Sequence, residues 1–154
     1  MNWLGLGVSF LWLVILGFIW YAPWFPTGAA WIRSQGLDPK NMPKMQGGKM
    51  AVSMILMLIG SFLMLFVFTH TFWVYQDAFR NVASHGIKDY KLKVMDGVMG
   101  GFFTWLGFIV PLNFNSVAFD NKPWKLFWVN AGYYLVGLVV AGILLTTVGK
   151  FGAA

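Results

Sequence analysis

Residues 50–76 read MAVSMILMLIGSFLMLFVFTHTFWVYQ, 27 residues in a row without Asp, Glu, Lys or Arg. An α-helix needs about 20 apolar residues to cross a hydrocarbon core roughly 30 Å thick. Three more uncharged stretches occur at 1–32, 97–119 and 126–149, and the charged residues lie between these stretches or at Lys150. Because a membrane span must satisfy its own backbone hydrogen bonds, the sequence predicts an all-α integral membrane bundle of four transmembrane helices.

The four spans are expected at about 3–21, 50–75, 97–116 and 124–148, within a single transmembrane domain of residues 1–154. An even number of spans places both termini on the same side of the membrane.

The connections carry two further helical patterns. Between residues 27 and 36 there is room for a short surface helix, after the cluster of Trp and Pro that ends the first span. Phe79, Val82 and Ala83 have helical spacing beside Arg80, which predicts a short interfacial helix after the second span.

The net charge of +6 resides in the loops. No basic run exceeds two residues, so the basic residues are expected to meet anionic membrane lipids and not nucleic acid. Six Lys and Arg lie on the side of the first connection and five on the side of the termini, so the positive-inside rule does not orient the chain. The chain has no Cys, which excludes disulfides and thiolate metal sites.

The third span carries a stripe of small residues at spacings of three and four. Small residues let two helix backbones approach closely in lipid. We expect the stripe to seat another helix of the same bundle, with a second copy of the protein as the alternative. Pro111 removes the helical donor for the carbonyl of Gly107, so a bend is expected there. The helix-packing stripe comprises Gly97, Gly100, Gly101, Thr104, Gly107 and Pro111.

Polar residues gather near the opposite membrane face from the termini. Intramembrane polar groups are costly in lipid and are therefore candidate functional residues. One interpretation is a polar pocket for a small solute. The other, which we favour, is that the amides hydrogen-bond to each other and to the backbone near Pro111. The candidate pocket residues are Asn113, Asn115, Asn130, Tyr21 and Ser53.

Near the membrane face of the termini, His70 is the titratable residue placed clearly inside a span. It is a candidate proton or ligand site, although a lone His is more often a hydrogen-bonded packing residue. Asp96 directly precedes the third span and is expected to be its N-cap.

The second span also carries methionines along one face. Thioether sulfur is a ligand suited to Cu(I), so a copper site formed by these methionines is a remote alternative. Methionine is also the adaptable gap-filler of apolar interiors, and packing is the expected role. The residues are Met50, Met54, Met57 and Met64. We expect no bound metal and no other cofactor.

Catalytic patterns are missing from the sequence. Five Asp, no Glu and two His form no paired carboxylates, no triad and no metal-binding helix motif. We therefore assign no catalytic residues and expect no enzymatic activity. The lack of Glu in the first span also argues against a proton-coupled small multidrug exporter of similar length.

Four short motifs are distributed over the whole chain. They are Gly17 with Trp20-Tyr21, Pro23, Phe25 and Trp31; Trp105-Leu106-Gly107-Phe108; Lys122-Pro123-Trp124-Lys125-Leu126; and Asn130-Ala131-Gly132-Tyr133. Together they resemble the bacterial domain of unknown function 1761 family. The resemblance implies a small four-span membrane protein of bacteria and implies no activity.

These observations favour a non-enzymatic accessory or binding subunit of the bacterial inner (cytoplasmic) membrane. Its expected partners are membrane lipids and either a second copy of itself or a larger membrane complex. The alternative is a carrier for a small hydrophobic or cationic solute that uses the polar pocket. Copper handling by the methionines is a remote alternative.

Overall fold

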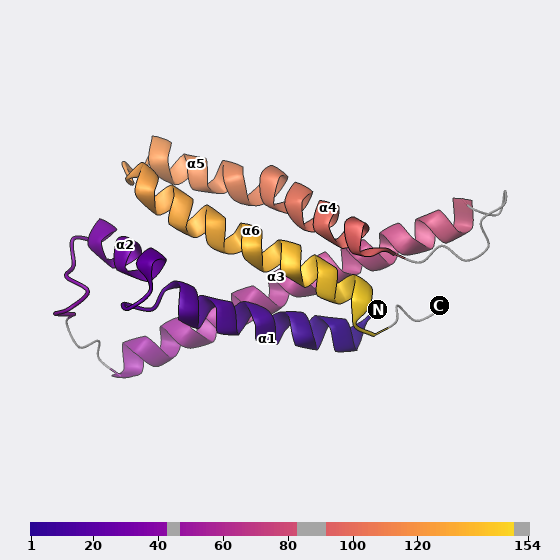
Figure 1. Ribbon diagram of the computed structural model, residues 1–154, viewed down its shortest axis with the longest axis horizontal. Coiled ribbons are helices and arrows are strands. Elements are labelled where there is room, and N and C mark those ends of the chain that lie inside the picture. Colours follow the sequence, from indigo (N-terminus) through magenta and orange to yellow (C-terminus); the bar gives the residue numbers. More distant parts are fainter. Residues whose placement is uncertain (43–46, 83–91, 150–154) are drawn as a thin grey trace.

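The computed structural model of the protein describes residues 1–42, 47–82 and 92–149. Within these residues all regular structure is helical (Figure 1). The elements are α1 (Trp3–Trp20), α2 (Pro26–Ser34), α3 (Gly47–Val82), α4 (Val94–Thr104), the π-helical segment η2 (Trp105–Ile109), α5 (Val110–Ala118) and α6 (Trp124–Thr147). Since α4, η2 and α5 follow one another without a break, they form one long helix.

Four helices are long and apolar enough to cross a membrane. They cover Trp3–Trp20, Gly47–Ala78, Val94–Ala118 and Trp124–Thr147. The predicted all-α class with four candidate spans is confirmed. A short fifth helix, α2, lies where the sequence predicts a surface helix, so the described chain has more helices than spans.

The second span is longer than predicted. α3 begins at Gly47 and continues to Val82, whereas the sequence predicts about 50–75. Residues 79–82 continue this helix, so the prediction of a separate interfacial helix around Phe79 is wrong; Ala83 lies outside the described residues. The helix continues because 76–82 contains no Gly or Pro that would stop it.

The helix α6 lies in the centre of the arrangement. In Figure 1, α4 and α5 run along one side of α6 and α1 runs along the other, while α3 crosses behind at an angle. The main core forms where α1 and α6 meet the second half of α3. Its buried members include Leu6, Leu13 and Leu16 of α1, Leu65, Phe68 and Phe72 of α3, and Leu138, Ala141 and Leu145 of α6.

Two glycines bring α4 and α6 into backbone contact. A Cβ atom at Gly97 would collide with the carbonyl of Gly142, and one at Gly142 would collide with the carbonyl of Gly97. One turn further along α4, a Cβ atom at Gly101 would lie 2.6 Å from the carbonyl oxygen of Leu138. Larger side chains at these positions would push the two helices apart.

The buried side chain of Asn2 fastens the start of α1 to the end of α6. Its Oδ1 accepts a hydrogen bond from the N–H of Gly5 (2.9 Å) and caps α1. Its Nδ2 donates to the carbonyl of Leu145 (3.0 Å) and to the carbonyl of Val148 (2.6 Å). The start of α1 and the end of α6 therefore share one end of the bundle. That both termini lie on one side of a membrane stays a prediction.

A widened turn precedes Pro111, where the sequence predicts a bend. The N–H of Val110 donates to the carbonyl of Trp105, five residues earlier, so η2 is wider than an α-helix. Proline lacks an N–H, and its ring crowds the carbonyl four residues before it. A wide turn just before the proline relieves that crowding.

Asp96 is not the N-cap of its helix, contrary to the prediction. Lys93 takes the N-cap position, and Asp96 is the third residue of α4. The Oδ2 atom of Asp96 accepts a hydrogen bond from the N–H of Lys93 (2.7 Å). A carboxylate in the first turn of a helix also interacts favourably with the helix dipole, which explains why the residue stands there.

Candidate functional site

The two amides at the centre of the predicted polar pocket bond to separate partners. The hydroxyl of Tyr21 donates to Oδ1 of Asn130 (3.0 Å). Burial raises the pKa of Tyr21, so its phenol stays protonated and able to donate. The Nδ2 of Asn113 donates to the carbonyl of Ile109 (2.9 Å), one turn earlier in the same helix. The amides thus bond to a tyrosine and to a backbone carbonyl, not to each other.

The other two predicted pocket residues lie elsewhere. Asn115 is exposed on α5, and Ser53 is exposed on the first half of α3. The structure therefore brings together Tyr21 and Asn130 from the predicted set and separates the rest.

A cavity of about 290 Å³ opens beside Tyr21, and it faces α3. The ring centroids of Tyr21 and Tyr133 lie 5.4 Å apart, and the hydroxyl of Tyr133 donates to the carbonyl of Leu13 (3.0 Å). The wall of the cavity is mainly aromatic and aliphatic, which suits an apolar group such as a lipid chain. The lining residues are Gly17, Tyr21, Leu56, Met57, Gly60, Ser61, Met64, Tyr133 and Tyr134.

His70 and the methionines of α3 lie mostly at its surface. His70 is exposed, and its ring centroid lies 5.3 Å from that of Trp73. Met50, Met54 and Met57 are exposed, whereas Met64 is half-buried in the cavity beside Tyr21. Among the described residues, no three His, Asp or Glu side chains are grouped so that they could hold a metal ion.

The small-residue stripe divides between two neighbouring helices. Gly97 and Gly101 face α6, while a Cβ atom at Gly100 would lie 2.5 Å from the ring of Phe72 on α3. Gly107 has no neighbouring atom within 4 Å of its Cβ position, and Pro111 is exposed. Gly107 lies in the π-helical segment η2 and meets no neighbouring helix, so the stripe does not extend to it.

A cleft of about 410 Å³ separates α3 from α4, and we call it the α3–α4 cleft. Four of its nine lining residues are aromatic. Asp96 and Tyr75 supply polar groups where α4 begins, and the hydroxyl of Thr71 is bonded to the carbonyl of Val67 (3.0 Å). An apolar cleft with a carboxylate at one end suits an amphipathic cation. The lining residues are Phe68, Thr71, Phe72, Tyr75, Asp96, Met99, Gly100, Phe103 and Thr104.

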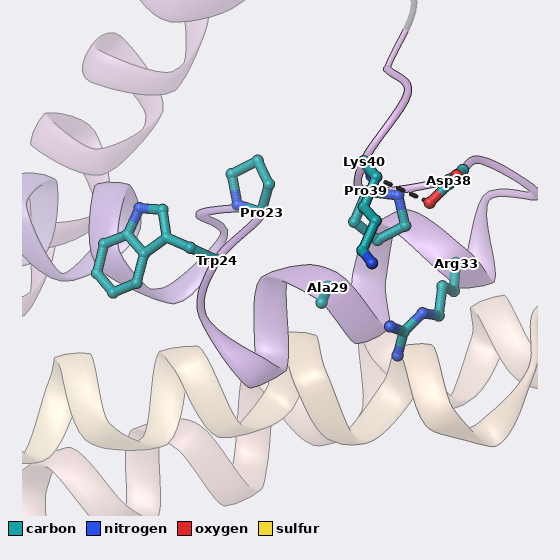
Figure 2. A pocket seen from close by; sticks show the side chains of 7 residues that line it. All are labelled: Pro23, Trp24, Ala29, Arg33, Asp38, Pro39 and Lys40. Atoms are coloured by element: carbon teal, nitrogen blue, oxygen red, sulfur yellow. Dashed lines mark hydrogen bonds between the residues drawn. The ribbon is translucent and has the colours of Figure 1, made fainter.

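A second cleft, of about 400 Å³, lies against α2 at the opposite end of the bundle, and we call it the α2 cleft. Figure 2 shows the side chains of Arg33 and Lys40 extending in the same direction, with Ala29 beside them. Oδ1 of Asp38 accepts a hydrogen bond from the backbone N–H of Lys40 (3.0 Å). The lining residues are Pro23, Trp24, Ala29, Arg33, Asp38, Pro39 and Lys40.

Two tryptophans hold α6 in a way that the sequence analysis missed. Nε1 of Trp20 donates to the carbonyl of Val129 (3.0 Å), and Nε1 of Trp105 donates to the carbonyl of Ala131 (2.7 Å). Trp105 lies in the middle of a span, where most buried indole N–H groups bond to an acceptor inside the protein, so its position in the sequence was a signal.

Comparison with known proteins gives one match. The model of the family described as protein of unknown function (DUF1761) matches residues 4–146, nearly the whole chain, which confirms the resemblance found from the motifs. No curated protein and no solved structure matches the chain.

Proposed function

The chain belongs to the family described as protein of unknown function (DUF1761), and we propose that it is a non-enzymatic membrane protein that binds a further membrane helix through α3. The partner helix belongs to a second copy of the chain or to a larger membrane complex. The observation that carries this proposal is the uncovered first half of α3, in which every residue of 47–60 is exposed.

Burial differs strongly between α3 and the central helix. In the most apolar 18-residue window of α3, 11% of the residues are buried, against 44% in α6. The buried apolar residues of α3, Leu65, Phe68 and Phe72, all lie in its second half. The first half is therefore left to lipid or to a partner.

Small residues in this uncovered half favour a partner over lipid. Gly60 has no atom within 4 Å of its Cβ position, and Ser53, two turns earlier, is exposed. Glycine inside a helix costs up to about 1 kcal/mol relative to alanine. In α4 that cost accompanies close packing on α6, whereas the space beside Gly60 is the cavity next to Tyr21, which the described chain leaves open. A helix from another chain that packs beside α3 would fill this space.

The polar groups inside the spans support a packing role. The hydroxyl of Ser9 donates to the carbonyl of Ala141 (3.3 Å), which ties α1 to α6. Asn2, Tyr133 and Trp105 also donate to backbone carbonyls of neighbouring helices. Groups committed to helix packing are unlike the free acids and bases that catalysis requires. Four helices are long and apolar enough to cross a hydrocarbon core of about 30 Å, which supports a membrane location, and we propose the bacterial inner (cytoplasmic) membrane as that location.

The test uses the lack of cysteine in the chain, since each introduced cysteine is then the only one. Single cysteines replace Ser53, Leu56 or Met57 on the face of α3 that carries Gly60, and Phe108 or Leu112 on the outer face of η2 and α5 as controls. Membranes are oxidised, and disulfide-linked dimers are measured on non-reducing gels. We expect dimers at α3 positions on one face and none at the controls.

A larger complex would give a different result. The α3 variants would then stay monomeric on oxidation, while the protein purifies in mild detergent with another subunit in fixed stoichiometry, and a Gly60→Leu substitution would release that subunit. Equal cross-linking at α3 and control positions, or a monomer that purifies with no fixed partner, would contradict the proposal.

A carrier for a small hydrophobic or cationic solute is the second candidate, and the α3–α4 cleft favours it in place of the amide pocket. We expect tetraphenylphosphonium, an apolar cation, to bind the purified protein. Asp96→Asn keeps an oxygen for the N–H of Lys93 but removes the charge, and it should weaken binding about tenfold. Asp120→Asn, at the other end of the bundle, is the matched control. Equal affinity of both variants would exclude this use of the cleft.

A further inference from the structure

One wall of the α2 cleft is held by a tight turn between α1 and α2. The hydroxyl of Thr27 donates to the carbonyl of Trp20 (2.5 Å). Gly28 packs so closely on this turn that a Cβ atom there would collide with the carbonyl of Ala22. The segment that carries Trp24 is therefore fixed against the first turns of α2.

The other wall is formed by a turn that ends α2 and reverses the chain. Gly36 has a φ of 76°, a left-handed conformation that favours glycine. Its N–H donates to the carbonyl of Arg33 (3.0 Å), and the N–H of Leu37 donates to the carbonyl of Ile32 (3.2 Å). This pair of bonds is a Schellman motif, which ends α2 and turns the following segment back toward the surface of α2. Lys40 is thereby brought into the same cleft as Arg33.

The cleft has an excess of positive charge. Arg33 and Lys40 contribute two cations, and the single carboxylate, that of Asp38, accepts a hydrogen bond from the backbone of Lys40. The guanidinium of arginine presents a planar fork of N–H donors that matches the oxygens of a phosphate group. A lysine beside it adds a point charge of the same sign.

The position of the cleft matches the level of lipid head groups. It follows directly on Trp20, where the span formed by α1 ends. The indole of Trp24 is 75% exposed at its rim, and exposed tryptophans at the ends of spans lie at the membrane–water interface. Phosphate groups of phospholipids lie at the same level.

We propose that the α2 cleft binds a phosphate group, held by Arg33 and Lys40, and that the group is supplied by the head group of an anionic phospholipid. The lipid head lies between α2 and the returning segment. Dissolved phosphate carries the same chemistry, and the experiment below separates the two sources.

The first measurement compares two charge-matched double variants in mild detergent. R33Q/K40Q removes both cations of the cleft, whereas K122Q/K125Q removes two exposed cations near the start of α6, at the same end of the bundle and outside the cleft. Native mass spectrometry counts retained phosphatidylglycerol after equal additions of phosphatidylglycerol and phosphatidylcholine. We expect R33Q/K40Q to retain about tenfold less phosphatidylglycerol than the unmodified protein, and K122Q/K125Q to retain it.

A third variant tests the shape of the site. Ala29→Trp fills the cleft without a change of charge, and we expect it to lose phosphatidylglycerol as R33Q/K40Q does. Circular dichroism checks that each variant keeps its helices. Equal losses in the two double variants, or full retention in Ala29→Trp, would show general attraction to basic loops and overturn the proposal.

The source of the phosphate is assigned by thermal melting in detergent free of added lipid. A rise in the melting temperature on addition of phosphatidylglycerol, absent with inorganic phosphate and lost in R33Q/K40Q, supports the lipid head group. A rise with inorganic phosphate that is likewise lost in R33Q/K40Q keeps the phosphate site but assigns it to a dissolved anion. No rise with either probe would overturn the proposal.

Discussion

Gly97 and Gly142 each occupy the space that a side chain on the other would need. The carbonyl of each residue lies where a Cβ atom of its partner would stand. The backbones of α4 and α6 are thus in direct contact near the end of the bundle where α1 begins. In a membrane, where lipid is as apolar as the helices, such contact supplies much of the association.

Replacing Gly142 with Leu should therefore destabilise the protein. The new side chain collides with a backbone carbonyl, which cannot move aside as a flexible side chain does, so we expect the free energy of unfolding to fall by about 3 kcal/mol. Unfolding of the purified protein in mild detergent measures the loss.

Gly107→Leu is the matched control, because nothing lies within 4 Å of the Cβ position of Gly107. The sequence alone places Gly107 in the same packing stripe as Gly101 and therefore predicts a loss of stability at both positions. The structure predicts no loss of stability at Gly107. Equal losses of stability at Gly142 and Gly107 would contradict a close backbone contact between α4 and α6 at Gly142.

A double-mutant cycle tests the hydrogen bond between Tyr21 and Asn130. Tyr21→Phe and Asn130→Leu should each reduce the free energy of unfolding by about 1 kcal/mol, because each leaves one polar partner unsatisfied. The double variant should lose clearly less than the sum, since no unpaired group then remains. Strict additivity in the cycle would mean that the two side chains do not bond.

Asn2→Ala removes a cap and a link between α1 and α6 together. The alanine loses the bond to the N–H of Gly5 and both bonds to the end of α6, so we expect a loss of about 2 kcal/mol. Asn2→Asp keeps the acceptor for Gly5 but loses the donor, and should show how the cost divides. Full stability of the alanine variant would argue against the link.

The topology prediction is tested with reporter fusions. A reporter after Ala154 and one after residue 90 should lie on the same side of the membrane, and one within 36–48 should lie on the other. The physical reason is that four helices are long and apolar enough to cross a membrane, whereas the charged connections are costly to place in lipid. Termini on opposite sides of the membrane would contradict the arrangement of four spans.

The spans were predictable because charge is excluded from lipid so strictly. The ends of α1 and α6 agree with the sequence to within one residue, since Trp20 and Thr147 border segments that stop a span by proline, glycine or charge. The end of α3 was not predictable from charge, because a helix continues into water when nothing in 76–82 breaks it.

The partners of polar residues could not be predicted in the same way. In a soluble helix the apolar face identifies the core, but in α1 and α6 the positions facing lipid and those facing protein are both apolar. Helix rotation is then set by small residues and by a few hydrogen bonds. The sequence placed Asn113 and Asn130 at the same depth, yet they bond to Ile109 and Tyr21 because their helices turn them apart.

The α2 cleft was missed for a related reason. Arg33 and Lys40 are seven residues apart in a segment that resembles an ordinary basic loop. Only the reversal at Gly36 brings them to one place, and that glycine carried no signal apart from its position after a predicted short helix.

The unequal lengths of α1 and α3 make this bundle sensitive to hydrophobic mismatch. The 18 residues of α1 span about 27 Å, which fits a hydrocarbon core of about 30 Å with the helix nearly upright. The 27 uncharged residues of 50–76 span about 40 Å, so they fit the same core only when α3 tilts by about 40°. The oblique crossing of α3 behind α1 in Figure 1 meets both requirements at once. A thinner bilayer would increase that tilt and change the orientation of the uncovered half of α3. The length of the lipid chains would therefore determine the angle at which a partner helix meets α3.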